Sequence, residues 1–443
     1  MTIKTIPLII IIALCISACQ STSTDLERLP VKPFDPNSPN IIFILADDLG
    51  YGDLSCYGHP YSITPNLDAL AEDGMMLKNF YAAGVTCAPS RTAFMTGRYP
   101  NDIPGGSLKN REENVLVLTN ILKQYGYATG HVGKWHMGSF DESFGIDSFR
   151  PSEREKIDPN NKDQTVFDRA LSFIQEHTEA PFYLNIWTHS THFPVPGATA
   201  ASHDLFDSLA VEKEMFGDWY VQHKLNILER DAVDIDSSMI NYLSELYRLD
   251  VQIGRLLAGL DTLGLQENTM IVFSSDHGPG RIDVKKDDPN TYNMLGYSGG
   301  YRGEKHSTQE GGVKIPFIIR WPERLGRQLV DSTSVVSAID FLPSVCAVLD
   351  LDISNLKLQG EDKSPVLFGV PEDRQSPLFW HARSKTSILF DQWKMYETEE
   401  DNYALYNLRE DPFEQREVSG EYLEIVTSLR NKMEEWEENI LSR

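Results

Sequence analysis

Short apolar runs alternate along the chain with segments of helical periodicity. Four of these runs read as buried strands, and they cover residues 41–45, 126–132, 182–187 and 270–273. Between these strands, residues 64–74, 119–125 and 239–264 are predicted to be helices. The signals are apolar residues three and four positions apart, residues that favour a helix start, and a glycine at the end. Strands that alternate with helices favour an α/β fold, in which helices cover both faces of a mostly parallel sheet.

Polar residues follow each of the four strands at its carboxyl end. In open α/β sheets the ligand crevice lies beyond these ends. The pairs are Asp47 with Asp48, Lys134 with His136, His189 with His192, and Asp276 with His277. We therefore expect one polar site, assembled from residues that lie up to about 230 positions apart.

The C-terminal part of the chain has a different pattern of hydrophobic residues. Apolar segments at 378–380, 387–390, 393–396 and 404–408 predict a small antiparallel sheet, and apolar positions from Leu423 to Ile440 predict a final helix. We place a domain boundary near residue 370, with a catalytic domain over 39–370 and an α+β subdomain over 371–443. Residues 391–443 hold 15 acidic and 6 basic side chains, so much of the negative charge lies in this subdomain.

Length and charge narrow the class of protein. The chain has 443 residues and a formal charge of −25, which argues against a general nucleic-acid binder because phosphate affinity rests on excess Lys and Arg. Five cysteines, two of them among the first nineteen residues, exclude a disulfide scaffold. An acidic globular protein of the size of an enzyme remains.

The first residues read as a targeting segment. A lysine, an apolar run and then Ile16-Ser17-Ala18-Cys19 resemble the signal peptide and lipobox of bacterial lipoproteins. We expect residues 1–18 to be removed, Cys19 to be lipidated, and residues 19–38 to form a flexible tether. The alternative is an ordinary cleaved signal peptide with an incidental cysteine. The prediction is an exported, membrane-anchored lipoprotein in the periplasm or at the cell surface.

The segment Cys87-Ala-Pro-Ser-Arg-Thr-Ala-Phe-Met-Thr-Gly-Arg98 carries the chemistry. It places a cysteine just before a short helix that is expected to begin at Pro89-Ser90 and to end at Gly97. Helix N-termini favour anions, and Arg91 adds fixed positive charge. From these residues alone, Cys87 is either a thiolate nucleophile or a buried small residue.

This segment resembles the C-x-P-S-R…T-G-R signature of the type I sulfatases, with Phe94 where that family usually has Leu. The resemblance implies an alkaline-phosphatase-like fold. It also implies that Cys87 is oxidised before folding to Cα-formylglycine, whose hydrated aldehyde is the nucleophile, and that the host supplies a maturation enzyme.

Six more motifs extend the resemblance over nearly the whole mature chain. Four are single segments: Ile41–Gly52 (IIFILADDLGYG), Gly133–Gly138 (GKWHMG), Thr191–Pro194 (THFP) and Ser275–Gly278 (SDHG). The other two are split: Arg302–Lys305 is followed by Glu310–Gly312, and Leu405–Leu408 is followed by Asp411, Pro412 and Glu414. The implied metal ligands are Asp47, Asp48, Cys87, Asp276 and His277. Carboxylate oxygens suit Ca²⁺, or Mg²⁺ in its place. His277 stands where the family usually has Asn, which makes the identity of the metal less certain.

The resemblance also implies the catalytic roles. Arg91 and Lys134 would bind the nucleophile and the sulfate, and His136 would take a proton when sulfate leaves. His192 and Lys305 would bind sulfate and protonate the leaving oxygen. His189 is expected to be structural or to face the substrate.

Two segments are candidates for choosing the substrate, residues 198–238 and 280–301. We name Trp219, Tyr297 and the neighbouring Arg302 as substrate-binding, because aromatic rings beside cations suit sulfated sugars. The alternative is that these insertions pack their aromatic rings on the domain surface.

The sequence therefore predicts a sulfatase that acts on sulfated carbohydrates, most similar to the arylsulfatase and N-acetylgalactosamine-6-sulfatase branch. One alternative is a phosphodiesterase or phosphonate monoester hydrolase with the same nucleophile. Another is a glycan-binding lipoprotein without activity.

Overall fold

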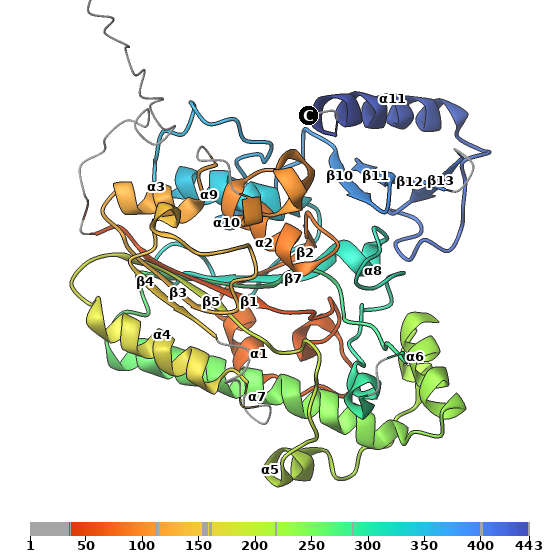
Figure 1. Ribbon diagram of the computed structural model, residues 1–443, viewed down its shortest axis with the longest axis horizontal. Helices are drawn as coiled ribbons and strands as arrows, with labels where there is room; N and C mark the ends of the chain where they lie inside the picture. The colour runs from red at the N-terminus through yellow and green to blue at the C-terminus, as the bar shows by residue number, and fades with distance from the viewer. Residues whose placement is uncertain are drawn as a thin grey trace, which may run out of the picture.

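The strands form two sheets of very different size (Figure 1). The computed structural model describes residues 35, 37–110, 115–152, 158, 162–217, 219–285, 288–398 and 402–441. The predicted signal peptide 1–18, Cys19 and all of the tether 19–38 except residues 35, 37 and 38 lie outside the described residues. Within the described ranges, no helix is long and apolar enough to span a membrane.

The large sheet has nine strands among the described residues, and β7 is the one that runs antiparallel to its neighbours. Its order is β4-β3-β5-β1-β6-β7-β2-β8, with β9 paired to β2. The strands are β1 Asn40–Ala46, β2 Met75–Tyr81, β3 Ala128–Gly133, β4 Ser148–Pro151, β5 Phe182–Trp187, β6 Thr269–Ser275, β7 Lys314–Arg320, β8 Leu329–Asp331 and β9 Val336–Ser337. The four predicted strands are the parallel neighbours β3, β5, β1 and β6.

Helices cover both faces of this sheet, because its strands are apolar on both sides. In β1, Ile41, Phe43 and Leu45 join one hydrophobic cluster, while Ile42 and Ile44 join the other. The first cluster is covered by α2 Cys87–Thr96, α3 Leu118–Gln124 and α9 Phe341–Val348. The second is covered by α1 Pro65–Glu72, α4 Gln164–Glu176 and α7 Ile235–Thr262 (Figure 1).

The remaining helices lie around the rim of the large sheet. They are α5 Ala200–His203, α6 Trp219–Arg230, α8 Glu310–Val313 and α10 Ser364–Leu367. Residues of α6 and of the first half of α7 form a third hydrophobic cluster around Phe216.

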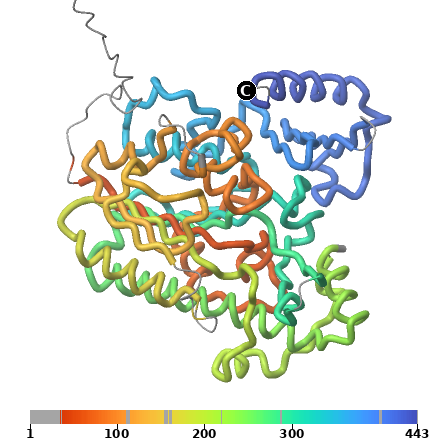
Figure 2. Tube along the Cα trace, in the orientation of Figure 1, coloured from red at the N-terminus to blue at the C-terminus, as the bar shows by residue number. Residues whose placement is uncertain are grey.

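The C-terminal subdomain packs against one end of the large domain (Figure 2, blue). Its sheet has the order β10 Leu378–Ala382, β11 Lys385–Phe390, β12 Trp393–Glu397, β13 Tyr403–Asn407, all antiparallel. Helix α11, Leu423–Ile440, lies on this sheet with Trp436 stacked on Phe379 and edge-on to Tyr99 of the large domain.

The predicted fold class is thus confirmed, both for the mostly parallel sheet between helices and for the small antiparallel sheet with its helix. The division at residue 370 stays a prediction, and that residue falls between α10 and β10. Helix α2 differs from expectation, since it begins at Cys87 rather than at Pro89.

Candidate active site

The polar pairs that follow β1, β3, β5 and β6 lie at one edge of the large sheet, because these strands are parallel neighbours. Backbone hydrogen bonds join the strand ends: Asp47 donates to the carbonyl of Ser190, and Lys134 donates to that of Trp187. Asp276 donates to the carbonyl of Ala46. Asp47, Asp48, Asp276 and His277 are all buried there.

Four side chains form a compact anionic group at this edge. One ligand atom from each of Asp48, Cys87, Asp276 and His277 lies within 4.8 Å of the others. His277 Nε2 is 3.3 Å from the Cys87 sulfur, 3.2 Å from Asp48 Oδ1 and 3.5 Å from Asp276 Oδ1. Asp47, the fifth predicted ligand, lies beside this group, and its oxygens face Lys134 and Arg91.

The donor set fits a divalent cation. His277 Nδ1 is 2.9 Å from the carbonyl oxygen of Gly278, which can only accept, so Nδ1 carries a proton and Nε2 is the ring nitrogen that can offer a lone pair. That lone pair faces the carboxylate oxygens of Asp48 and Asp276. A ring nitrogen and two carboxylate oxygens that converge in this way are ligands of the kind that hold a metal ion.

Three cations surround the anionic group. Lys305 Nζ lies 2.7 and 2.9 Å from the two oxygens of Asp48 and 3.6 Å from the sulfur of Cys87, and Lys134 forms an ion pair with Asp47. Burial by itself would raise the pKa of Asp47, but Lys134, His192 and Arg91 hold it well below its usual range. These charges allow carboxylates to stay ionised in a buried site.

Arg91 ties three strand ends together. Its guanidinium is fully buried, donating from Nε to Asp276 at 2.9 Å and from Nη1 to the carbonyl of Lys134 at 2.9 Å, with Nη2 3.3 Å from Asp47. It also lies over the ring of Trp187. This geometry holds the carboxylates of Asp47 and Asp276 next to the end of β3.

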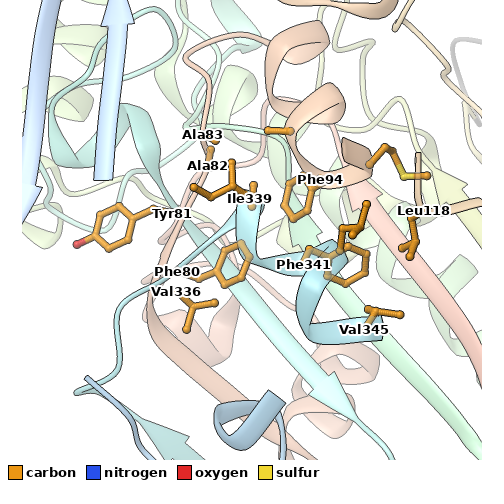
Figure 3. Close-up of a cluster of buried hydrophobic side chains, with 14 of the residues drawn as sticks. Phe80, Tyr81, Ala82, Ala83, Phe94, Leu118, Val336, Ile339, Phe341 and Val345 are labelled. Carbon is orange, nitrogen blue, oxygen red and sulfur yellow. The ribbon is translucent and has the colours of Figure 1, made fainter. Parts of the chain in front are cut away.

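Helix α2 holds Cys87 at the centre of the site. Phe94, the position that departs from the family pattern, packs into the core between Phe80, Phe43 and Phe341, with ring centroids 5.0 to 6.0 Å away (Figure 3). The side chain of Cys87, about two turns earlier in the helix, is 3% exposed. Burial, then Asp47 and Asp276, raise the pKa of the Cys87 thiol well above its ordinary value.

Besides His277, the site contains His136, His189 and His192, and these three differ in their surroundings. His192 donates from Nδ1 to the carbonyl of Phe193, so its Nε2 is the nitrogen that titrates. Desolvation, then Lys134 and Arg91, lower the pKa of His136 to about 4, and His136 has a left-handed backbone with φ 56°. The pKa of His189 is also lowered to about 4, chiefly by burial, and its Nε2 is buried without a hydrogen-bond partner among the described residues.

The loop that carries His189 and His192 is held by residues that the sequence analysis did not identify. Asp163 accepts hydrogen bonds from the backbone N–H groups of His189 and Ser190 at 2.8 and 3.1 Å. Lys162 donates to the carbonyl of His192 and forms a buried ion pair with Glu245 of α7. Neither residue belongs to a recognisable motif, and the contacts span 26 to 83 positions of sequence.

Helix α7 supports the site through polar residues on its otherwise apolar face. Tyr242 donates to Asp53 at 2.6 Å and lies 3.2 Å from the hydroxyl of Thr191. Asp250, one turn further on from Glu245, accepts the N–H groups of Asn66 and Leu67 at the start of α1. The face of α7 whose apolar periodicity indicates core packing therefore also carries polar side chains that hold neighbouring loops in place.

Two glycines of the motifs are required by close backbone approach. A Cβ on Gly133, whose φ is +96°, would lie 1.9 Å from the carbonyl oxygen of Trp187, and a Cβ on Gly278 would lie 2.0 Å from that of Gly311. The first contact brings Lys134 to the end of β5. The second brings His277 against the Glu310–Gly312 segment.

The three predicted substrate residues have different fates. The ring of Tyr297 is buried against Phe216 and His59, and its backbone N–H donates to Asp53, so its role in substrate binding stays a prediction. Arg302 is exposed and donates to the hydroxyl of Tyr406 and to the carbonyl of Glu414. Trp219 begins α6, and its side chain lies outside what the structure describes.

A buried nucleophile position beside lysines and a cation site suits the transfer of a dense oxyanion. The lysines and a bound cation would neutralise charge on its oxygens, and the histidines supply proton donors and acceptors. The geometry serves hydrolysis of a sulfate or phosphate ester equally.

Comparison with known proteins separates these two. The Sulfatase family model matches residues 39–351. Human arylsulfatase A is 30% identical over 366 residues, covering 77% of this chain and 70% of its own length. The N-acetylgalactosamine-6-O-sulfatase of Bacteroides thetaiotaomicron is 28% identical, covering 89% and 92%. The solved structure of Ps i-CgsB with k-i-k-neocarrahexaose shares the fold, with a TM-score of 0.74, 24% identity and coverage of 90% and 92%. The chain belongs to the sulfatase family and is a sulfuric ester hydrolase.

Proposed function

We propose that this protein is an exported, formylglycine-dependent sulfatase that hydrolyses sulfate monoesters of sulfated carbohydrates. The observation that carries the proposal is the position of Cys87. It begins a helix within the C-x-P-S-R signature, and its sulfur is 3.6 Å from Lys305 Nζ and 3.3 Å from His277 Nε2.

The chain's own residues divide the work as follows. Formylglycine made from Cys87 would supply a hydroxyl nucleophile, and a Ca²⁺ or Mg²⁺ ion held by Asp47, Asp48, Asp276 and His277 would supply charge neutralisation. Lys134 and Lys305 bind the sulfate oxygens. His192 donates a proton from Nε2 to the leaving sugar oxygen, and His136 accepts the proton that is released when sulfate departs.

The substrate class rests on relatives. One curated relative is an N-acetylgalactosamine-6-O-sulfatase, and a solved structure that shares the fold at 20% identity is described with its substrate D-glucosamine-2-N,6-O-disulfate. Both names point to sulfate esters on amino sugars. We therefore place the substrate among sulfated oligosaccharides or polysaccharides.

The test is an assay of purified protein that has been co-expressed with a formylglycine-generating enzyme. Mass spectrometry of the peptide that contains position 87 measures conversion, and a desulfation screen over defined sulfated oligosaccharides measures activity. Cys87→Ala should lose several orders of magnitude in turnover, whereas Cys346→Ala, a matched change at another buried cysteine, should keep it. If Cys87→Ala retained most of the activity, the nucleophile would be wrong.

The same preparation tests the competing reaction. A phosphonate monoester hydrolase shares the fold with a TM-score of 0.67 and 19% identity. Nitrophenyl sulfate and a nitrophenyl phosphodiester should give a kcat/KM ratio in favour of the sulfate. A large preference for the phosphodiester would overturn the proposed reaction.

Export and anchoring are a separate part of the proposal, supported by the lipobox resemblance at Cys19. Wild-type protein expressed in a bacterial host should fractionate with membranes and carry an acyl mass on its N-terminal peptide. Cys19→Ala should release it. Soluble wild-type protein with an unmodified N-terminus would contradict the anchor and leave the enzymatic proposal intact.

A further inference from the structure

A cavity of about 250 Å³ opens beside the nucleophile, between the two domains. Its large-domain wall includes Thr86, which precedes Cys87, and His306, which follows Lys305. Its other wall is the end of β10, from Trp380 to Arg383. The C-terminal subdomain therefore forms one wall of a cavity whose other wall holds the sequence neighbours of Cys87 and Lys305.

This cavity continues into a second one of about 330 Å³. The two share His306, Ala382 and Arg383. The charged side chains that line the second cavity are Arg302, Arg383, Lys385 and a single carboxylate, Glu397. In a chain with a net charge of −25, a cleft with three cations and one acid is a local exception, and its sign suits an anionic ligand.

Arg383 is a cation on the cavity wall, and it lines both cavities. It is exposed, and no ion pair or side-chain hydrogen bond occupies its guanidinium in the part of the chain that the structure describes. Arg302, by contrast, donates to Tyr406 and Glu414. Arg383 lies close enough to His306 to help lower the pKa of that histidine to about 4, after the effect of burial and of Arg281 and Lys305.

The backbone at both residues is strained. Arg383 and Ser384 have φ angles of 53° and 61° and form the two-residue turn between β10 and β11, a turn usually made by Asn-Gly. His306, on the opposite wall, has φ 74°. Left-handed backbone at residues other than glycine costs free energy, and it concentrates at functional positions. Here it occurs on both walls of one cavity.

We propose that Arg383, on the wall of this cavity opposite His306, binds a second anionic substituent of the substrate, either on the sugar that carries the sulfate ester or on the unit joined to it. The substituent is a carboxylate or a second sulfate, since either matches the forked donors of a guanidinium. This inference rests on the proposed sulfatase function and makes the C-terminal subdomain a specificity element. Arg383 selects doubly charged substrates and takes no part in the chemical step.

The test uses Arg383→Asn, because Asn tolerates the left-handed turn and removes only the charge. Arg430→Ala is the matched control, since Arg430 lies on α11 of the same subdomain, is paired with Glu434 and is remote from the cavity lining. Nitrophenyl sulfate and N-acetylgalactosamine 6-sulfate carry one anionic group. A chondroitin 6-sulfate disaccharide adds a carboxylate, and glucosamine 2-N,6-O-disulfate adds a sulfate.

Two readouts are taken on full-length protein. The first is kcat and KM of the formylglycine-bearing enzyme on each compound. The second is calorimetric binding of the same compounds to Cys87→Ala protein, with and without Arg383→Asn, which needs no turnover. We expect wild type to prefer at least one doubly charged compound, and Arg383→Asn to weaken that binding and raise its KM at least tenfold. The compound affected identifies the substituent as carboxylate or sulfate.

The singly charged compounds should be unaffected by Arg383→Asn, and Arg430→Ala should change nothing. Equal loss on singly and doubly charged compounds would overturn the proposal, since Arg383 would then act on the fold or on the chemical step. A wild-type protein that binds doubly charged compounds no better than singly charged ones would overturn it too. Failure of the proposed function itself is recognised separately, as converted wild-type enzyme that cleaves no sulfate ester at all.

Discussion

Lys394 of the C-terminal subdomain reaches into the large domain and forms a fully buried ion pair with Glu310. The two side chains are 0% and 1% exposed, and Lys394 Nζ lies 3.0 Å from Glu310 Oε1. The ammonium also lies 3.8 Å above the ring of Trp380. We predict that Lys394→Met, which keeps the length of the side chain and removes the charge, strongly destabilises the protein.

The magnitude follows from the geometry. At 3.0 Å and an effective dielectric constant of about 20, the attraction is about 5 kcal/mol, and it is opposed by the desolvation of both charges. Removal of one partner leaves the other buried and unpaired, which typically costs about 3–5 kcal/mol. Glu310 would keep the hydroxyl of Tyr81 at 2.8 Å and Lys314 at 3.9 Å, so we expect the lower end, about 3 kcal/mol.

Urea unfolding followed by tryptophan fluorescence measures this loss, with circular dichroism as a second probe. Trp380 contacts Lys394 directly, so its signal reports the docking of the subdomain. Arg430→Met breaks an exposed pair with Glu434 in the same subdomain and should cost less than about 0.5 kcal/mol. A Lys394→Met protein whose free energy of unfolding lies within about 0.5 kcal/mol of wild type, at an unchanged m-value, would refute the reasoning.

Three further predictions concern the site and its pH dependence. His192→Ala should lower kcat about 10²- to 10⁴-fold on a sugar sulfate and much less on nitrophenyl sulfate, whose leaving group needs little protonation; equal losses on both would argue against an acid role. His277→Ala should abolish the rise in Tm that Ca²⁺ or Mg²⁺ gives wild type in a thermal shift assay, and an undiminished rise would remove His277 from the metal ligands. Burial and Glu310 raise the pKa of Glu414 to about 8, so the folded state holds this proton more tightly than the unfolded chain does. The resulting stability is present below about pH 4.5 and is lost as the pH rises through 8, and Glu414→Gln should flatten the fall in Tm between about pH 5 and 8.

Local patterns in the sequence determined the framework of this protein. The run 41–45 is apolar at every position, as expected of a strand buried on both faces, and it forms β1. Once β1, β3, β5 and β6 are parallel neighbours, their carboxyl ends share one edge, so Asp47, Lys134, His192 and Asp276 meet. The C-x-P-S-R segment and its companion motifs indicated the family because each motif is a short, nearly continuous stretch of sequence.

The tertiary structure alone decided which residues support and surround that site. Lys162 and Asp163 hold the His189–His192 loop from a separate segment, and Glu245 and Tyr242 interrupt the apolar face of α7 with no local signal of their purpose. Tyr297 was predicted to bind the substrate, and its side chain is buried, because its backbone N–H donates to Asp53, which is remote from it in sequence.

Arg383 is another residue whose surroundings could not be predicted from the sequence. Nothing near it in the sequence indicates a binding residue, and it shares a cavity with His306 because the C-terminal sheet packs against the large domain, where Lys394 pairs with Glu310. Periodicity and motifs report what a residue does within its own helix, strand or turn. Contacts between segments that lie hundreds of positions apart depend on how packed elements meet, which no local pattern encodes.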